Sequence, residues 1–344
     1  IKNVRAERML FESSITGIPG HPIEGIVLED IRVAYEGGGT AEWAQVEVPD
    51  REVVARYPEA QMFGRLPAYG LYVRHARDVA ARGMEFSLMA PDARPAVVFD
   101  DVAGARVERC RYAAPTGGQP VMSFTGIRDA LVKECTAMEG ASVFLRVFGD
   151  AASRREVRME GNVFPAAMKG VEYVTPEDLM AQLPSFSETS PGIVAVEAEQ
   201  LAIVPPMAVA AEKGALGGAV IGVPAEGGRD LGKARARFAV RATGKYVVKV
   251  RAFAAGPEED SFYFSIDGGR ERLSDFRRHG GWAWDFVRDR YGGANERDSS
   301  GFELSEGEHT LALRNREAGL RIDALAIVRA DRLDAFEHGP GLSP

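Results

Sequence analysis

Two adjacent aspartates, Asp100 and Asp101, are candidates for acid–base chemistry. Such chemistry needs one carboxyl group that gives a proton and one carboxylate that takes it, both facing the same reactant. The pair follows a short apolar run, which places it at a strand end or in a turn, where adjacent side chains tend to diverge. We therefore name Asp100 and Asp101 as catalytic candidates and expect their side chains to point apart.

Candidates for ligand binding lie in and just after an insertion between Gly37 and Tyr69 that is rich in aromatic residues. Aromatic faces stack on the apolar faces of ligand rings, and a cation or imidazole can bind a carboxylate. Alternatively, the aromatics pack against the protein and the basic residues belong to a solvated strand edge. The binding candidates here are Tyr57, Tyr69, Arg74 and His75, with Trp43, Phe63 and Arg77 beside them.

A second aromatic set lies in the segment GGWAWDFV. Trp282 and Trp284 are two residues apart, so both project to one side if the segment is extended. They would form a stacking platform that Phe286 and Tyr291 could extend, and Tyr263 is a further binding candidate. Because large aromatics usually serve the core, a buried tryptophan pair that anchors a long loop remains the alternative.

The elements that must position the first set of residues are repeats. Segments that start at Leu71, Val97 and Met122 align with offsets of 26 and 25 residues, and a fourth copy starts at Val143. A period in the twenties indicates a solenoid, and short β-branched runs broken by Gly, Asp and Pro favour a parallel β-helix. The alignment stacks Val73 on Phe99 and Phe124, Val79 on Ala105 and Ala130, and Cys110 on Cys135. An earlier coil points Ile26, Leu28, Ile31 and Val33 inward.

The chain has two cysteines, Cys110 and Cys135, which this alignment places in adjacent rungs. Adjacent strands lie roughly 4.8 Å apart, but parallel side chains in a packed column rarely reach the dihedral angle of a disulfide. We therefore predict two thiols in a small apolar ladder.

Composition excludes some classes of partner. The 344 residues are 45% hydrophobic with a formal charge of −8, which indicates a globular protein large enough for two domains. With 50 acidic against 42 basic residues there is no extended cationic surface, so we expect no nucleic-acid partner. No run approaches the length of a membrane span, and we expect no membrane partner. The chain begins at Ile1 without Met or a leader, so we expect a removed signal peptide or a missing start.

The sequence predicts an all-β protein of two domains. Residues 1–165 read as the β-helix, and residues 166–192, with several prolines and a short helical pattern, read as a linker. Residues 193–333 alternate apolar and polar positions between turn signals, which predicts an antiparallel, jelly-roll-like β-sandwich. Residues 334–344 form a tail.

Three segments of the first domain resemble the distal part of bacterial glycoside hydrolase family 28 proteins, the polygalacturonase-type β-helices. They are SITGIPGHPIEGIVLEDIRV (14–33), YPEAQMFGRLPAYGLYVRHARDV (57–79) and PDARPAVVFDDV (91–102). The resemblance covers about residues 1–165. It implies a right-handed β-helix, secreted or periplasmic, that hydrolyses pectic chains such as galacturonan or rhamnogalacturonan with inversion.

An inverting hydrolysis needs a carboxylic acid and a carboxylate roughly 6.5–9.5 Å apart. The family supplies them from Asn-Thr-Asp, Asp-Asp, Gly-His-Gly and Arg-Ile-Lys segments on earlier coils, which this chain lacks. Asp100-Asp101 falls downstream of those coils, and Gly20-His21-Pro22 and Arg321-Ile322-Asp323 are near misses in other contexts. We therefore expect either the C-terminal portion of such a hydrolase or a relative that kept the helix and lost the chemistry.

The second domain is similar to carbohydrate-binding modules of the family 6 and family 35 type. The resemblance lies in Glu197-Ala198-Glu199, Gly244-Lys245-Tyr246, Asp260-Ser261-Phe262 and Ile322-Asp323. It implies a structural calcium ion held by Glu197, Glu199 and Asp323, and oxygen ligands suit that ion. Alternate spacing would put both glutamates on one strand face, although solvated acids remain the alternative.

Two functions follow from these patterns. The first is a pectin-directed glycoside hydrolase with an appended glycan-binding module, seen here without its catalytic aspartates and needing no catalytic cofactor. The second is a noncatalytic carbohydrate-binding protein. Both imply a plant cell-wall polysaccharide or a related acidic glycan as the partner. A structural or adhesive rod rests on the fold alone.

Overall fold

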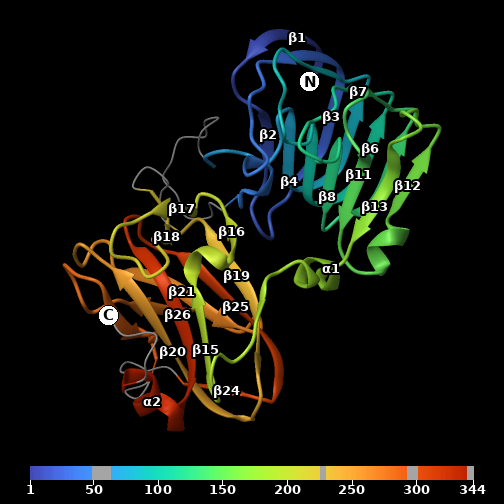
Figure 1. Ribbon diagram of the computed structural model, residues 1–344. Coiled ribbons are helices and arrows are strands. Elements are labelled where there is room, and N and C mark those ends of the chain that lie inside the picture. The colour runs from blue at the N-terminus through green and yellow to red at the C-terminus, as the bar shows by residue number, and fades with distance from the viewer. Residues whose placement is uncertain (49–62, 225–229, 293–300, 339–344) are drawn as a thin grey trace. The chain divides into compact units, whose positions relative to one another are not determined.

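The structure is a computed structural model that describes residues 1–48, 63–224, 230–292 and 301–338. It confirms the all-β prediction: a parallel β-helix is followed by antiparallel sheets (Figure 1). No helix in the described part of the chain is long and apolar enough to cross a membrane. The chain divides into two compact units at Ala181 and Gln182, inside the segment predicted as a linker.

Unit 1, the β-helix, is built from short strands that pair in parallel with the strands one coil away. Its elements are β1 (Lys2–Met9), β2 (Ser13–Thr16), β3 (Ile23–Tyr35), β4 (Leu71–Arg82), β5 (Glu85–Leu88), β6 (Val97–Glu108), β7 (Arg111–Tyr112), β8 (Met122–Thr125), β9 (Arg128–Lys133), β10 (Thr136–Ala137), β11 (Val143–Phe148), β12 (Val157–Glu160), β13 (Lys169–Val174) and helix α1 (Pro176–Ala181).

The predicted repeat alignment is confirmed through its first three copies. Leu71 pairs with Val97, and Val97 pairs with Met122, as the offsets of 26 and 25 residues require. The fourth copy is shifted, because Leu145, and not Val143, lies beside Met122. The two positions share the same side of the strand, so the face was right and the register along the strand was wrong by two residues.

Turns inside the coils stack on one another as the strands do. His75 (φ 48°), Asp101 (φ 52°) and Gly126 (φ 59°) occupy successive rungs of one corner, all in the left-handed region. That conformation is costly for most residues, and Gly, Asp, Asn and His tolerate it best. The corner therefore explains why the copies carry these residue types, and it turns the Asp101 side chain away from that of Asp100.

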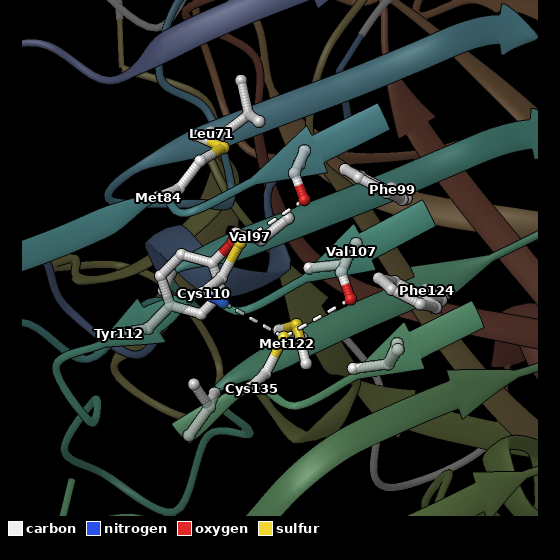
Figure 2. Packing of buried hydrophobic residues seen from close by; sticks show 14 of the residues in the cluster. Leu71, Met84, Val97, Phe99, Val107, Cys110, Tyr112, Met122, Phe124 and Cys135 are labelled. Atoms are coloured by element: carbon white, nitrogen blue, oxygen red, sulfur yellow. Dashed lines mark hydrogen bonds between the residues drawn. The ribbon is translucent and has the colours of Figure 1, made fainter. Parts of the chain in front are cut away.

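The interior of the β-helix is a column of stacked apolar side chains (Figure 2). Phe99 and Phe124 are fully buried, and their rings stack with centroids 5.0 Å apart. Cys110 and Cys135 are buried free thiols in this column, and the Cys110 N–H lies 3.5 Å from Cys135 Sγ. The predicted thiol ladder is present.

The described part of the insertion packs on the outer face of β4 and β6. Leu66 and Ala68 are buried there against Tyr72 and Val98. Tyr69 is 1% exposed, and its hydroxyl donates to the Ala113 carbonyl at 2.7 Å. For this residue the packing alternative describes the structure, because a buried ring has no face to offer a ligand.

Unit 2 contains two antiparallel sheets that enclose a second apolar core. The first sheet runs β14 (Ser185–Phe186), β19 (Lys233–Val240), β25 (Gly307–Asn315), β21 (Ser261–Ile266) and β22 (Arg272–Asp275), with β16 (Ala202–Val204) on β19. The second runs β17 (Ala208–Ala211), β18 (Ala219–Gly222), β26 (Arg321–Arg329), β20 (Gly244–Phe253) and β23 (Ala283–Phe286), with β15 (Ile193–Glu197) on β26 and β24 (Gly301–Leu304) on β20.

The segment predicted as a linker is shared between the units. β13 and α1 belong to unit 1, whereas β14 joins the first sheet of unit 2 beside β19. The predicted tail begins with helix α2 (Leu333–His338), whose Phe336 is buried. Helix α1 confirms the short helical pattern predicted in the linker, whereas β13, β14 and α2 were not indicated by composition.

Candidate functional site

A group of aromatic and charged side chains gathers where β20, β23 and β26 meet the loop after β17. Trp282, just before β23, packs against Phe253 at the end of β20 with ring centroids 5.7 Å apart. The Arg251 guanidinium lies 5.2 Å from the centroid of the Trp282 ring. Trp282 remains partly exposed, so its ring is supported from one side and reaches solvent on another.

An ion pair stands beside this aromatic pair. The Arg321 guanidinium lies 4.1 Å from the centroid of Phe253, and its NH1 donates to Glu212 Oε2 at 2.7 Å. The Arg321 and Glu212 side chains are 37% and 23% exposed. Two contacts fix the guanidinium, while a substantial part of its surface stays open. We call Glu212, Phe253, Trp282 and Arg321 the Trp282 site.

The loop that carries Glu212 approaches Trp282 closely. At Gly214 (φ 100°) a Cβ atom would lie 3.0 Å from Trp282 Nε1, so both the backbone conformation and the space favour glycine. Arg251 also donates to the Gly214 carbonyl at 3.3 Å. The loop is thereby tied to the sheet beside the indole ring.

Three carboxylates lie next to the Trp282 site. Arg251 connects them to the site, because it contacts both Asp323 and the Trp282 ring. Asp323 is fully buried, accepts the Leu216 N–H at 3.0 Å and forms a close ion pair with Arg251. Glu197 and Glu199 both approach Gly217, where a Cβ atom would meet an oxygen of each. The arrangement brings together the three acids that the resemblance assigned to calcium.

The spacing predicted that the two glutamates share one strand face, and the structure shows that they do not. β15 ends at Glu197, and a 3-10 turn over Ala198–Gln200 carries Glu199. Among the described residues, neither Glu197 Oε2 nor Glu199 Oε2 has a hydrogen-bond partner, although both atoms are buried. Burial, followed by the charges of Asp323 and Glu199, raises the pKa of Glu197. A cation would relieve this repulsion.

Whether these acids suit a metal depends on Asp323. No group of three His, Cys, Asp or Glu side chains in the described ranges is arranged to hold an ion. Both Asp323 oxygens already have partners, whereas one oxygen each of Glu197 and Glu199 has none. The donor set of buried carboxylate oxygens is the type that calcium prefers. The glutamates therefore leave oxygens of the kind that a hard cation takes, whereas both oxygens of Asp323 are already bonded to Leu216 and Arg251.

The other aromatic candidates of unit 2 have different surroundings. Trp284 pairs with Arg251 across β23 and β20, but its ring meets Phe336 of α2 edge-on, with centroids 5.2 Å apart. Tyr263 lies on β21 of the other sheet, with the Arg314 guanidinium 3.9 Å from its ring centroid. Tyr291 is 75% exposed. Trp282, Trp284 and Tyr263 are all partly exposed, and Trp282 differs from the other two in its contacts with Phe253, Arg251 and the loop at Gly214.

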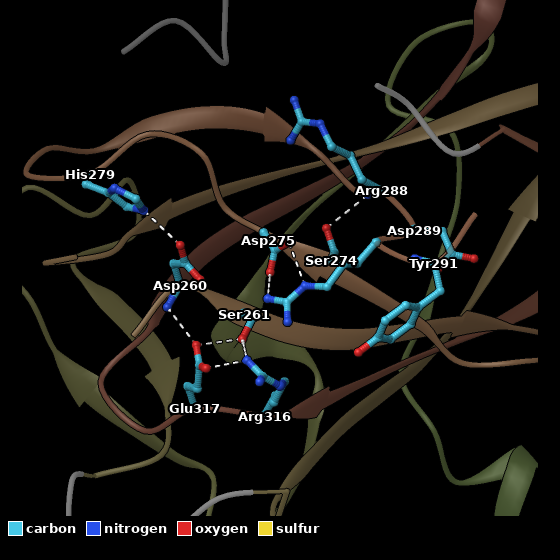
Figure 3. A network of polar contacts seen from close by, with 11 residues as sticks. Asp260, Ser261, Ser274, Asp275, His279, Arg288, Asp289, Tyr291, Arg316 and Glu317 are labelled. Carbon is cyan, nitrogen blue, oxygen red and sulfur yellow. Dashed lines mark hydrogen bonds and ion pairs between the residues drawn. The ribbon is translucent and has the colours of Figure 1, made fainter. Parts of the chain in front are cut away.

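A network of polar contacts supports the sheets of unit 2, and Tyr291 lies beside it (Figure 3). Ser261 Oγ donates to Glu317 at 2.6 Å and accepts from Arg316 at 2.7 Å, and Asp260 Oδ2 lies 2.9 Å from His279 Nε2. Burial raises the pKa of Asp260, and the hydrogen bond to His279 opposes that rise. Ser261 is fully buried, so the network ties β21 to the segment after β25 and offers no reactive hydroxyl.

The candidates of unit 1 form ion pairs with each other. Arg74 Nε lies 3.0 Å from Asp100, to which the Tyr72 hydroxyl also donates at 3.1 Å. His75 Nδ1 and Arg128 NH2 lie 2.8 Å and 3.0 Å from the two oxygens of Asp101.

These contacts set the charge of the aspartates. The hydrogen bond to His75, helped by Arg128, lowers the pKa of Asp101. Asp101 is thus held as a carboxylate, and its partners differ from those of Asp100, in agreement with the expected divergence. Tyr57 lies outside the described residues.

Sequence reasoning missed four residues of the central group: Glu212, Arg251, Phe253 and Arg321. Arg251 and Phe253 looked like ordinary alternating strand positions in KVRAF. Glu212 and Arg321 are separated by 109 residues, and no local pattern indicates their contact. The Gly-rich loop at 214–218 was the available signal, because it allows the backbone to approach an aromatic ring.

Comparison with known proteins adds little to this geometry. No family model matches the chain, and no curated protein matches it. Solved structures that resemble it include a family 35 carbohydrate-binding module from Clostridium thermocellum (15% identity, 40% of this chain and 98% of that chain, TM-score 0.32). Another is a Podospora anserina GH26-CBM35 β-(1,4)-mannanase (17% identity, 41% of this chain and 28% of that chain, TM-score 0.32).

A third is the C-terminal family 6 module of a marine laminarinase from Zobellia galactanivorans (15% identity, 40% of this chain and 99% of that chain, TM-score 0.29). The chain spans only 28% of the mannanase and 29% of an exo-β-1,3-galactanase from Phanerochaete chrysosporium. These TM-scores are too low for the likeness to decide a function. The residues around Trp282 have to carry that conclusion.

Proposed function

We propose that unit 2 binds a glycan at the Trp282 site. A sugar ring has an apolar C–H face and a polar hydroxyl edge, so it needs an aromatic surface next to hydrogen-bonding groups. Trp282 supplies a supported, partly open ring, and Arg321 and Glu212 supply a donor and an acceptor at its side. The single observation that carries the proposal is this pairing of an open indole with a fixed ion pair.

We further propose that a calcium ion binds at the three acids next to the Trp282 site and stabilises the loop beside it. Glu197 and Glu199 would hold it through the oxygens that lack partners, with Asp323 at the third position. The ion would supply positive charge among three carboxylates and would fix the loop that carries Gly214 and Leu216. Its role would be structural, and no chemical step depends on it.

The wider target that we propose is a plant cell-wall polysaccharide, with the protein secreted or periplasmic. The support is the family 28 resemblance at residues 14–33, 57–79 and 91–102. A pectin-directed, polygalacturonase-type hydrolase remains the second candidate function on the same ground. Within this chain Asp100 and Asp101 are engaged by Arg74 and His75, so neither receives an acid or base role.

Replacement of Trp282 tests the proposal. Trp282→Ala should weaken the binding of a glycan by about two- to tenfold, since stacking of aromatic rings is worth about 0.5–1.5 kcal/mol beyond the area buried and about 1.4 kcal/mol corresponds to a factor of ten. Calorimetric titration with the best ligand from a glycan array measures the change.

Tyr291→Ala, at a more exposed aromatic of the same unit, is the matched control and should bind as the wild type does. Equal affinity for wild type and Trp282→Ala, with both folded, would remove the site. Loss of binding in Tyr291→Ala would move it elsewhere.

A further inference from the structure

We propose that the Glu212–Arg321 pair is a clamp for sugar hydroxyls that makes the Trp282 site prefer uncharged sugars over uronates. The inference rests on the proposed glycan-binding function and names the class of sugar that the site takes. Its basis is the ion pair itself, which leaves Arg321 with its charge largely compensated. The sequence alone favoured an acidic glycan.

The clamp is held in place by both of its strands. Arg321 is the first residue of β26, and Glu212 directly follows β17. The Glu212 N–H donates to the Gly218 carbonyl at 2.9 Å and so closes the loop from residue 212 to residue 218. Phe253 supports the guanidinium from below at 4.1 Å. The two side chains therefore need little reordering before a ligand binds.

The chemistry of this pair suits adjacent hydroxyl groups. A guanidinium has five N–H donors and no acceptor, and a carboxylate has only acceptors. A hydroxyl group both donates and accepts. Because Arg321 NH1 and Glu212 Oε2 lie 2.7 Å apart, one hydroxyl of a sugar can accept from Arg321 while its neighbour donates to Glu212. A uronate carboxylate could use only the guanidinium and would face Glu212.

Electrostatics around the clamp point the same way. The charged side chains named in the Trp282 site and in the acid group beside it are four carboxylates and two guanidinium groups, so their summed formal charge is −2. The carboxylates belong to Glu197, Glu199, Glu212 and Asp323, and the guanidiniums to Arg251 and Arg321. A divalent ion among the three acids would bring the sum to zero and no further. In neither state do these six side chains carry a net positive charge that would attract an anion.

The sharpest test compares two polymers that differ in charge alone. Polygalacturonate and its carboxyl-reduced form share one backbone and one linkage, and an array of neutral and uronate-containing oligosaccharides widens the comparison. Wild type should bind the neutral member of each pair at least tenfold tighter. This affinity should change little between 50 mM and 500 mM salt, since no net charge is paired.

Two variants separate the clamp from mere folding. Glu212→Gln removes the repelling carboxylate and releases Arg321, so the neutral-to-uronate ratio of affinities should fall by about tenfold or more. Arg321→Gln should weaken neutral ligands and leave the discrimination against uronates in place. Arg314→Gln, whose guanidinium covers Tyr263 on the other sheet, is the control and should keep the wild-type ratio.

The outcomes are distinct. Tighter binding of the uronate polymer by wild type, or a ratio that Glu212→Gln leaves unchanged, overturns the clamp while Trp282→Ala still tests the site. Binding of equal affinity in wild type and Trp282→Ala, or no binding to any array member, overturns the glycan site and the clamp with it.

Discussion

The two units of this protein treat their polar side chains in opposite ways. On the β-helix, Arg74 and Asp100 pair across neighbouring rungs, and so do His75 and Asp101. On the β-sandwich, Glu197 and Glu199 are partly exposed, but each has one buried oxygen without a partner in the described structure, near a partly exposed Trp282. In the solenoid, charged side chains pair with each other and hold neighbouring coils together. A binding site keeps hydrogen-bonding capacity unused until a ligand or ion arrives.

The largest effect should come from the stacked core of unit 1. Phe99→Ala removes a fully buried ring that stacks on Phe124, so unfolding of the β-helix should become easier by about 3–5 kcal/mol. Hydrogen exchange measured on peptides of each unit should show lost protection in unit 1 and none in unit 2. Val27→Ala, at a position 45% exposed, should have almost no effect.

Equal loss of protection in both units would show that they do not unfold separately, and the contrast drawn between them would then fail.

Calcium should act on the other unit. At a concentration of 100 times its Kd, an ion that binds only the folded state adds about 2.7 kcal/mol of stability. Calcium should therefore raise the melting temperature of unit 2, and a chelator should reverse the change. The double variant Glu197→Gln, Glu199→Gln should lose this response and, with the repulsion gone, melt higher than wild type in chelator. A shift that survives in the double variant would place the ion elsewhere.

Much of this comparison was visible in the sequence, and the reason is the range of the contacts. The β-helix register follows from a period that recurs every 26 and 25 residues, so the period alone was enough to stack Val73, Phe99 and Phe124. Alternation fixes which face a residue takes but not the register at which one strand pairs with the next. For that reason Val143 was assigned to the correct face, one alternation away from its place.

The site itself was only half predictable. Trp282 and the three acids were named from spacing and resemblance, and the structure brings them near one another through Arg251. The Glu212–Arg321 pair joins residues 109 positions apart, and only the folded sheet brings them together. Tyr69 shows the opposite failure: an aromatic residue near a basic patch has the composition of a binding platform, yet its hydroxyl finds a buried carbonyl and its ring joins the core.

The smallest effect should be a difference in pH dependence between the units. Burial alone would lower the pKa of His309, but hydrogen bonds to Asp267 and to the Ser305 carbonyl raise it above 6.5. The stability from this pair is therefore fully present below pH 6.5 and lost as pH rises through the folded pKa. Asp101, whose pKa is lowered, stabilises unit 1 above pH 3.8, and this contribution is lost as pH falls through its folded value.

Denaturation midpoints of each unit between pH 2 and pH 9 measure the contributions of His309 and Asp101 to stability. Asp267→Asn should flatten the profile of unit 2 near neutrality, and Asp101→Asn should flatten that of unit 1 in acid. A profile of unit 2 that keeps its slope in Asp267→Asn would assign the dependence to other groups.

The central claim is that this chain recognises a glycan through unit 2, and one experiment addresses it directly. Wild-type protein is incubated with insoluble plant cell-wall polysaccharide, and the retained protein and the released reducing ends are measured in the same samples. The account predicts retention that Trp282→Ala lowers, with no more reducing ends than in the blank. Retention that is unchanged in Trp282→Ala, or release of sugar that Asp100→Asn or Asp101→Asn abolishes, would contradict it.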